Sequence, residues 1–332
     1  MVSAESRETE RETCFVVRVV RTLLRGAGQV MFQNSAWTGL LFLCGIGWGA
    51  WRAGRLEMAV GALVGLCVGT LAACMLGAPR EEIEDGLHGY NGILVGCALP
   101  VFLDGGPVCW GMVMAGAFFS TVIMMAVSQL FRSWKVSAMT GPFVFTTWFI
   151  LLASYSFSGV RAAALPHPVL PAPQSDMLTF SGLDMFFHAS LTGVSQVFLI
   201  DDAVAGGFFL AGLAAGSLSA AVYGWTGSLV AMSTALLLGA NGADVHAGLY
   251  QFSAVLTAIG IGTTFYHPGW RAALYTLLAT VFTVVAQGAL NAALAPLGIP
   301  TLTFPFVIAA WLFLLPHVDL EPENRTDSKT SV

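Results

Sequence analysis

Charged residues are scarce in this sequence. Only 10% of its 332 residues are Asp, Glu, Lys or Arg, against roughly 25% in soluble domains. Fifteen of these 33 charges lie in residues 1–27 and 317–332, so that 18 remain for the 289 residues between them. A soluble globule of this size needs a far more polar surface. The middle of the chain is therefore predicted to lie in a membrane.

Several chemical motifs are also missing. The six cysteines are scattered and form no CxxC pair, which argues against a zinc or redox centre. The six histidines show no pair at metal-ligand spacing, and neither a nucleophile motif nor a basic patch is present. We therefore expect no metal, no cofactor, no nucleic-acid partner and no enzymatic activity.

Long apolar segments fill the middle of the chain. Helices are expected there, because lipid offers no partners for open backbone groups and about 20 residues of helix span a bilayer. The short segment 90–103 and the segment after Gly239 each follow a polar, glycine-rich stretch, which predicts a pair of half-helices. Ten elements are predicted in all, at residues 28–50, 56–78, 90–103, 107–131, 138–158, 193–216, 217–239, 248–265, 270–294 and 300–316.

The two halves of the chain are related in sequence. Residues 29–46 align without gaps with residues 196–213, where seven of 18 positions are identical, and residues 140–148 align with residues 303–311, where five of nine are. Chance similarity between apolar residues does not explain a Gln-Val and a Thr-x-Pro-Phe-Val motif matched at similar separation. An odd number of crossings makes the second copy enter from the opposite side of the membrane. The fold expected is an all-α polytopic membrane protein with ten transmembrane elements in two inverted five-helix repeats, each with a pore half-helix.

The duplication also predicts the topology and the division of the chain. Ten crossings return both termini to one side, and cytoplasmic termini place seven Arg and Lys residues inside against three outside, as the positive-inside rule favours. We expect a multi-pass protein of the cell inner membrane with both termini cytoplasmic. Its segments are a cytoplasmic N-terminal segment at 1–27, repeats at 28–158 and 193–316, a linker at 159–192 and a cytoplasmic tail at 317–332.

The predicted spans hold almost no ionisable groups, whereas ion-coupled transporters usually keep one on their pathway. Asp201, Asp202 and Asp244 lie near element ends, where solvation or helix capping accounts for them. A neutral pathway suits a small, planar, polar solute. Such a solute needs hydrogen-bond acceptors, because an unsatisfied polar group in an apolar setting costs ~2–7 kcal/mol, and it needs flat apolar walls that exclude hydrated ions.

Four motifs give the chain a resemblance to a known family. They are QVMFQN at residues 29–34, GLHGYNGILVG at 86–96, QVFLIDD at 196–202 and TFPF at 303–306. Their order and spacing cover nearly all of residues 28–316. In these motifs the sequence resembles the urea transporters, and among them the bacterial urea channels.

The resemblance implies a homotrimer surrounded by lipid, with one pore through each protomer and passive, channel-like flux of urea. It implies ladders of oxygen atoms at the pore half-helices, threonines at the narrow centre and flat hydrophobic slots at either end. The pore residues that it implies are Gln29, Phe32, Leu94, Thr140, Gln196, Val197, Leu256 and Thr303, and the half-helix ends are His88, Tyr90, Asn91, Tyr250, Phe252 and Ser253.

Three positions depart from the family pattern. Ser35 and Asp202 precede alanine where the family often has Asn-Pro, and Ser253 stands in the place that Asn91 holds in the first half.

A channel for another small neutral solute, such as water, glycerol or a short amide, is the main alternative function, although the paired Asn-Pro-Ala motifs of aquaporins are absent. An ammonium or ammonia channel is a second alternative, for which we find no pair of facing intramembrane histidines in the sequence. A purely structural membrane protein would leave two preserved half-helix sites without a purpose.

Overall fold

The computed structural model describes residues 4–172 and 183–320. Within these ranges the chain is helical, with one isolated β-bridge between Leu103 and Ala162. A π-helical stretch, Gly260–Phe265, extends α12. The helices are α1 (Ala4–Gln29), α2 (Ala36–Arg52), α3 (Leu56–Met75), α4 (Arg80–Glu84), α5 (Tyr90–Phe102), α6 (Pro107–Phe131), α7 (Gly141–Ala153), α8 (Leu183–Ser195), α9 (Ala203–Gly216), α10 (Leu218–Leu237), α11 (Gly242–His246), α12 (Phe252–Ile259), α13 (Trp270–Leu294) and α14 (Phe304–Leu314).

Several of these helices suit a bilayer. Four are long and apolar enough to cross one, namely α3, α6, α10 and α13, and a fifth span results if α8 and α9, which meet at 74°, count as one broken element. The helices α5, α7, α12 and α14 are apolar but shorter. The chain is thus a multi-pass helical membrane protein. Each of the ten predicted segments overlaps most or all of a different helix (α2, α3, α5, α6, α7, α9, α10, α12, α13 or α14), while the number of helices that cross the membrane fully stays a prediction.

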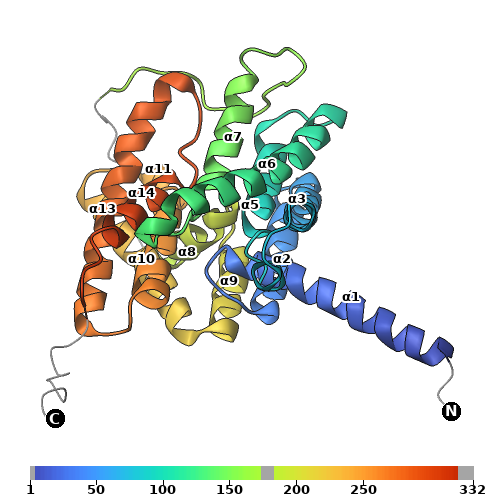
Figure 1. Ribbon diagram of the computed structural model, residues 1–332. Coiled ribbons are helices and arrows are strands. Elements are labelled where there is room, and N and C mark those ends of the chain that lie inside the picture. The colour runs from blue at the N-terminus through green and yellow to red at the C-terminus, as the bar shows by residue number, and fades with distance from the viewer. Residues whose placement is uncertain (1–3, 173–182, 321–332) are drawn as a thin grey trace, which may run out of the picture.

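The two halves of the chain build matching series of helices. Each series occupies its own side of the molecule, blue to green for the first and yellow to red for the second (Figure 1). The helices α3 and α10 both have 20 residues, α4 and α11 five, and α6 and α13 25. The backbone repeats as well, since Phe32 and Leu199 share a left-handed φ of 63° and 59°, and Met139 and Leu302 one of 53° and 50°.

The halves contact each other through reciprocal pairs. Trp148 donates from its indole nitrogen to the Pro300 carbonyl at 2.8 Å, and Trp311 donates in the same way to the Ser137 carbonyl at 3.1 Å. On the opposing helices α2 and α9, the rings of Phe42 and Phe209 lie 5.4 Å apart. Contacts that are repeated with the partners exchanged are the pattern of a two-fold relation.

Glycines allow the short helix α5 to approach α3 closely. A Cβ atom on Gly61 would lie 2.3 Å from the Gly96 carbonyl oxygen, and one on Gly96 would lie 1.9 Å from the Gly61 oxygen. Both distances are shorter than any real contact, so the two backbones touch without side chains between them. Gly-x-x-x-Gly spacing supports close packing of this kind in membranes.

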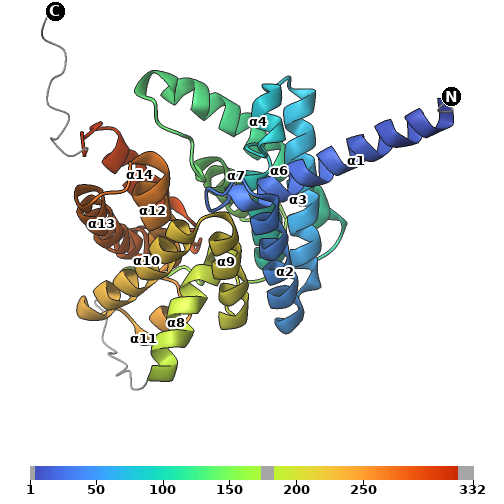
Figure 2. The same cartoon turned by 90° about the horizontal axis from the view of Figure 1, so that it is seen from below.

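The N-terminal segment and the linker contain more helix than predicted. The helix α1 runs through the N-terminal segment 1–27 to Gln29 and extends away from the other helices (Figures 1 and 2). The helix α8 begins at Leu183, within the predicted linker, while Val169 of the same linker donates to the Ala295 carbonyl at 3.1 Å. The predicted boundaries stay predictions. The remaining parts of these segments, residues 1–3, 173–182 and 321–332, lie outside the described residues.

Candidate functional site

Thr140 and Thr303 form the centre of the candidate site. Thr140 directly precedes α7, and Thr303 directly precedes α14. In both helices the second residue is a proline, Pro142 or Pro305. A proline in the first turn breaks no helical hydrogen bond, because its missing N–H would have no partner inside the helix. The left-handed residue before each threonine turns the chain, and the two hydroxyl oxygens meet at 2.7 Å, with both side chains 2% exposed. Either hydroxyl can donate or accept.

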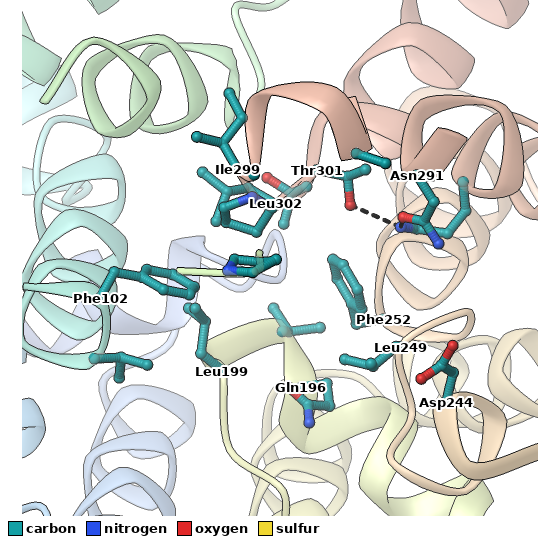
Figure 3. Close-up of a pocket in the computed structure, with 18 of the residues that line it drawn as sticks. Phe102, Gln196, Leu199, Asp244, Leu249, Phe252, Asn291, Ile299, Thr301 and Leu302 are labelled. Carbon is teal, nitrogen blue, oxygen red and sulfur yellow. Dashed lines mark hydrogen bonds between the residues drawn. The ribbon is translucent and has the colours of Figure 1, made fainter. Parts of the chain in front are cut away.

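A cavity of about 550 Å³, shown in Figure 3, is lined by Thr303 but not by Thr140. Four of the predicted site residues line it, namely Gln196, Val197, Phe252 and Thr303. Apolar side chains make up much of its remaining wall, and the linker contributes to it. Among the other lining residues are Val101, Phe102, Phe143, Pro166, His167, Val169, Leu199, Leu249, Ile299 and Leu302.

The break between α1 and α2 holds Gln29 and Phe32. The Gln29 amide donates to the Asp85 carbonyl at 3.0 Å. The Phe32 ring lies edge-on against Phe265 and Phe306, with ring centroids at 5.7 and 6.0 Å. Phe32 corresponds in the first half of the chain to Leu199 in the second half, and Leu199 lines the cavity.

Ser35 and Asp202, two of the three departures from the family pattern, both cap helices. The Ser35 hydroxyl accepts from the Thr38 backbone N–H at 3.3 Å, and the Asp202 carboxylate accepts from the Ala205 N–H at 2.8 Å. Capping satisfies N–H groups that have no partner inside the helix. The chain therefore breaks in the same way in both halves without Asn-Pro.

Leu94 and Leu256 lie at equivalent places on the short helices α5 and α12. Both side chains are completely buried in the core, and neither lines the cavity. Their neighbours include Phe143 and Phe306 in the same core cluster. A role for the two leucines as slot walls stays a prediction.

The residues predicted at the end of the first half-helix are engaged in hydrogen bonds. The Tyr90 hydroxyl donates to the Met139 carbonyl at 2.7 Å and so holds the left-handed turn before Thr140. The Asn91 carbonyl oxygen accepts from the Phe143 backbone N–H at 3.1 Å, in the first turn of α7. Burial lowers the pKa of the His88 imidazole, while the Glu82 carboxylate at 3.1 Å acts in the opposite direction.

The second half-helix repeats this arrangement only in part. The Ser253 hydroxyl is buried and has no partner among the described residues, because serine is too short to make the bond that Asn91 makes. Burial raises the pKa of the nearby Asp244 carboxyl.

These residues lie at the N-terminal ends of α5 and α12, where a helix presents free N–H groups. Carbonyl oxygens come instead from the turns that precede each half-helix. The Asp85 oxygen accepts from Gln29, and the Val245 oxygen accepts from Gln251 at 2.7 Å. An oxygen ladder at these ends would consist of such turn carbonyls.

The structure adds residues that the sequence analysis missed. The rings of His188 on α8 and His246 on α11 stack at 4.5 Å with an interplanar angle of 10°, although no sequence spacing linked them. They do not line the cavity, so they offer no support for an ammonia pathway through it. Gln287, Asn291 and Thr301 do line it. Aligning the second half of the chain with the first would have singled out these three polar residues, because apolar or smaller residues stand at the equivalent positions of the first half.

An all-helical chain with several apolar spans and a buried hydroxyl pair at a cavity defines a multi-pass membrane protein with a solute-sized site. A model of the family described as urea transporter matches residues 20–318. Urea transporter 1 from Ovis aries is 30% identical over 302 residues, which are 90% of this chain and 77% of that protein. Urea transporter 1 from Rattus norvegicus is 30% identical over 303 residues with the same coverage. The chain belongs to the urea transporter family.

Proposed function

We propose that this protein transports urea passively across the membrane, as a channel. The relatives named urea transporter 1 support the solute. The structural observation that carries the proposal is the buried hydroxyl pair of Thr140 and Thr303, of which Thr303 lines a largely apolar cavity. A neutral solute passes such a place without the desolvation penalty that an ion would meet.

In this proposal the two threonines form the narrow centre of the pore. Their hydroxyls exchange their mutual hydrogen bond for bonds to the solute, since a hydroxyl donates to a carbonyl oxygen and accepts from an amide N–H. Turn carbonyls before α5 and α12 act as further acceptors. Flat apolar side chains form a slot on each side of the centre. The proposed slot residues are Phe32 and Leu94 with Gln29 nearby, and Val197 and Leu256 with Gln196 nearby.

The architecture proposed with this function is a pair of inverted repeats. The reciprocal bonds of Trp148 and Trp311 support a two-fold relation between the halves. We further propose that three protomers assemble in the cell inner membrane, each with its own pore, and that both termini are cytoplasmic.

Urea efflux from proteoliposomes tests the proposal. Vesicles that contain the purified protein should release urea faster than protein-free vesicles of the same lipid. Equal rates would contradict urea transport. Water, short amides and ammonia, measured in the same vesicles, show whether another small neutral solute passes instead.

A further inference from the structure

The cavity has a polar wall made by three side chains. Gln287 and Asn291 lie one turn apart on α13, and Thr301 precedes α14. The Gln287 amide nitrogen donates to the Asn291 side-chain oxygen at 2.9 Å and to the Thr301 hydroxyl at 2.7 Å. In Figure 3, Thr301 and Asn291 lie together on the side of the cavity away from Phe102 and Leu199.

These bonds leave the Gln287 side-chain oxygen and the Thr301 hydroxyl hydrogen unused. Both amide hydrogens of Gln287 have partners, but its oxygen has none among the described residues, and the side chain is 2% exposed. Thr301 accepts from Gln287, so its own hydroxyl hydrogen is left to donate. A buried acceptor without a partner is unfavourable, and its presence in a folded protein calls for an explanation.

The first half of the chain lacks this wall. Thr140 and Thr303 are 163 residues apart, and at the same separation Gln287, Asn291 and Thr301 correspond to Met124, Ser128 and Ala138. The polar wall therefore occurs in the second half only and is not part of the packing that the two halves share. It belongs to one end of the proposed pathway.

We propose that the wall is a vestibule site that binds the amide group of the permeating solute before it reaches the threonine pair. The Thr301 hydroxyl donates to the solute carbonyl, and the Gln287 oxygen accepts a solute N–H. The site rests on the proposed function, because urea supplies a carbonyl and N–H groups in the required combination. Asp244, which lines the same cavity, adds a further acceptor for N–H groups.

The test compares urea flux at increasing urea concentration in vesicles that contain wild-type protein or a variant. Gln287→Met introduces the residue that the first half has and removes the amide. We expect the half-saturating urea concentration to rise about 3- to 10-fold, as for the loss of one hydrogen bond, with the maximal flux nearly unchanged. Gln129→Met, at an exposed position of α6, is the matched control and should leave both quantities unchanged.

A second pair of variants keeps the test decisive if Gln287→Met fails to fold. Thr301→Ala should raise the half-saturating concentration in the same way, and Thr301→Ser, which keeps the hydroxyl, should restore it. Saturation-transfer NMR of urea with the solubilised protein should show the same order of binding.

The outcomes separate the site from the transport activity. Wild-type flux no faster than protein-free vesicles would contradict the proposed function itself. Urea flux that is protein-dependent but linear with concentration in the wild type would overturn the vestibule site alone. An unchanged half-saturating concentration in both Gln287→Met and Thr301→Ala would overturn it equally.

Discussion

The hydroxyl oxygens of Thr140 and Thr303 lie 2.7 Å apart, and the two residues hold the same place in the two halves of the chain. Equivalent residues that touch each other lie on the axis of a two-fold relation. Phe42 and Phe209 form a second contact of this kind, at 5.4 Å. The proposed inverted repeat requires such self-paired contacts, and it places the threonine pair midway along the pathway.

Removing the hydroxyl of either Thr140 or Thr303 should lower the urea flux. Thr140→Val and Thr303→Val keep the shape of the side chain and delete one hydrogen bond in a buried constriction, at a cost of ~1–3 kcal/mol. This corresponds to a roughly 5- to 150-fold drop in flux. Stopped-flow measurement of urea flux, normalised to protein per vesicle, checks the prediction.

Thr226→Val provides the control for these two variants. The Thr226 hydroxyl bonds the carbonyls of its own helix, α10, and the side chain is exposed on the helix surface. Its removal should leave urea flux unchanged. Wild-type flux in both central variants would mean that their hydroxyls are structural and that the narrow centre lies elsewhere.

Adding a methyl group between α3 and α5 should destabilise the fold. Gly61→Ala and Gly96→Ala place a Cβ atom against backbone oxygens of the opposing helix. Overpacking of a core costs ~1–3 kcal/mol, and backbone gives way less readily than a side chain. Thermal unfolding in detergent should show a clear fall in Tm. Gly111→Ala, which meets no atom within 4 Å, should leave Tm unchanged or raise it slightly.

The lowered pKa of the His88 imidazole should reduce the free energy of unfolding in mild acid. Burial lowers its pKa in the folded state, whereas the unfolded chain has the ordinary value of about 6.5. As pH falls through that value the unfolded state binds more protons than the folded state, so the free energy of unfolding decreases. The fall in Tm between pH 7.5 and pH 5.5 should be smaller in His88→Gln. An equal fall in both proteins would exclude His88 as its source.

The proposed topology can be read from labelling. Single cysteines placed before residue 20 and after residue 320, in a variant without the native cysteines, should react with an impermeant reagent only after the cells are permeabilised. Reaction at either end in intact cells would place that terminus outside and reverse the orientation.

The helices and the central pair were accessible from the sequence because their signals are local or repeated. The apolar segments 107–131 and 270–294 coincide with α6 and α13, since uninterrupted apolar composition in lipid leaves helix as the only satisfied backbone. The Thr-x-Pro-Phe-Val motif occurs twice, which singled out Thr140 and Thr303 before any contact between them was visible.

What only the tertiary structure decided is which side chains pair across elements. The sequence holds no signal that joins Gln287 to Thr301 or stacks His188 on His246, because such contacts depend on how helices from different parts of the chain pack. The unpartnered hydroxyl of Ser253 is of the same kind, since a bond fails there only because a shorter side chain does not span the gap that Asn91 spans. Residue type and periodicity determine the element and the face, whereas a hydrogen bond is made or lost by differences of less than about an ångström in donor–acceptor distance, and the packed fold sets these distances.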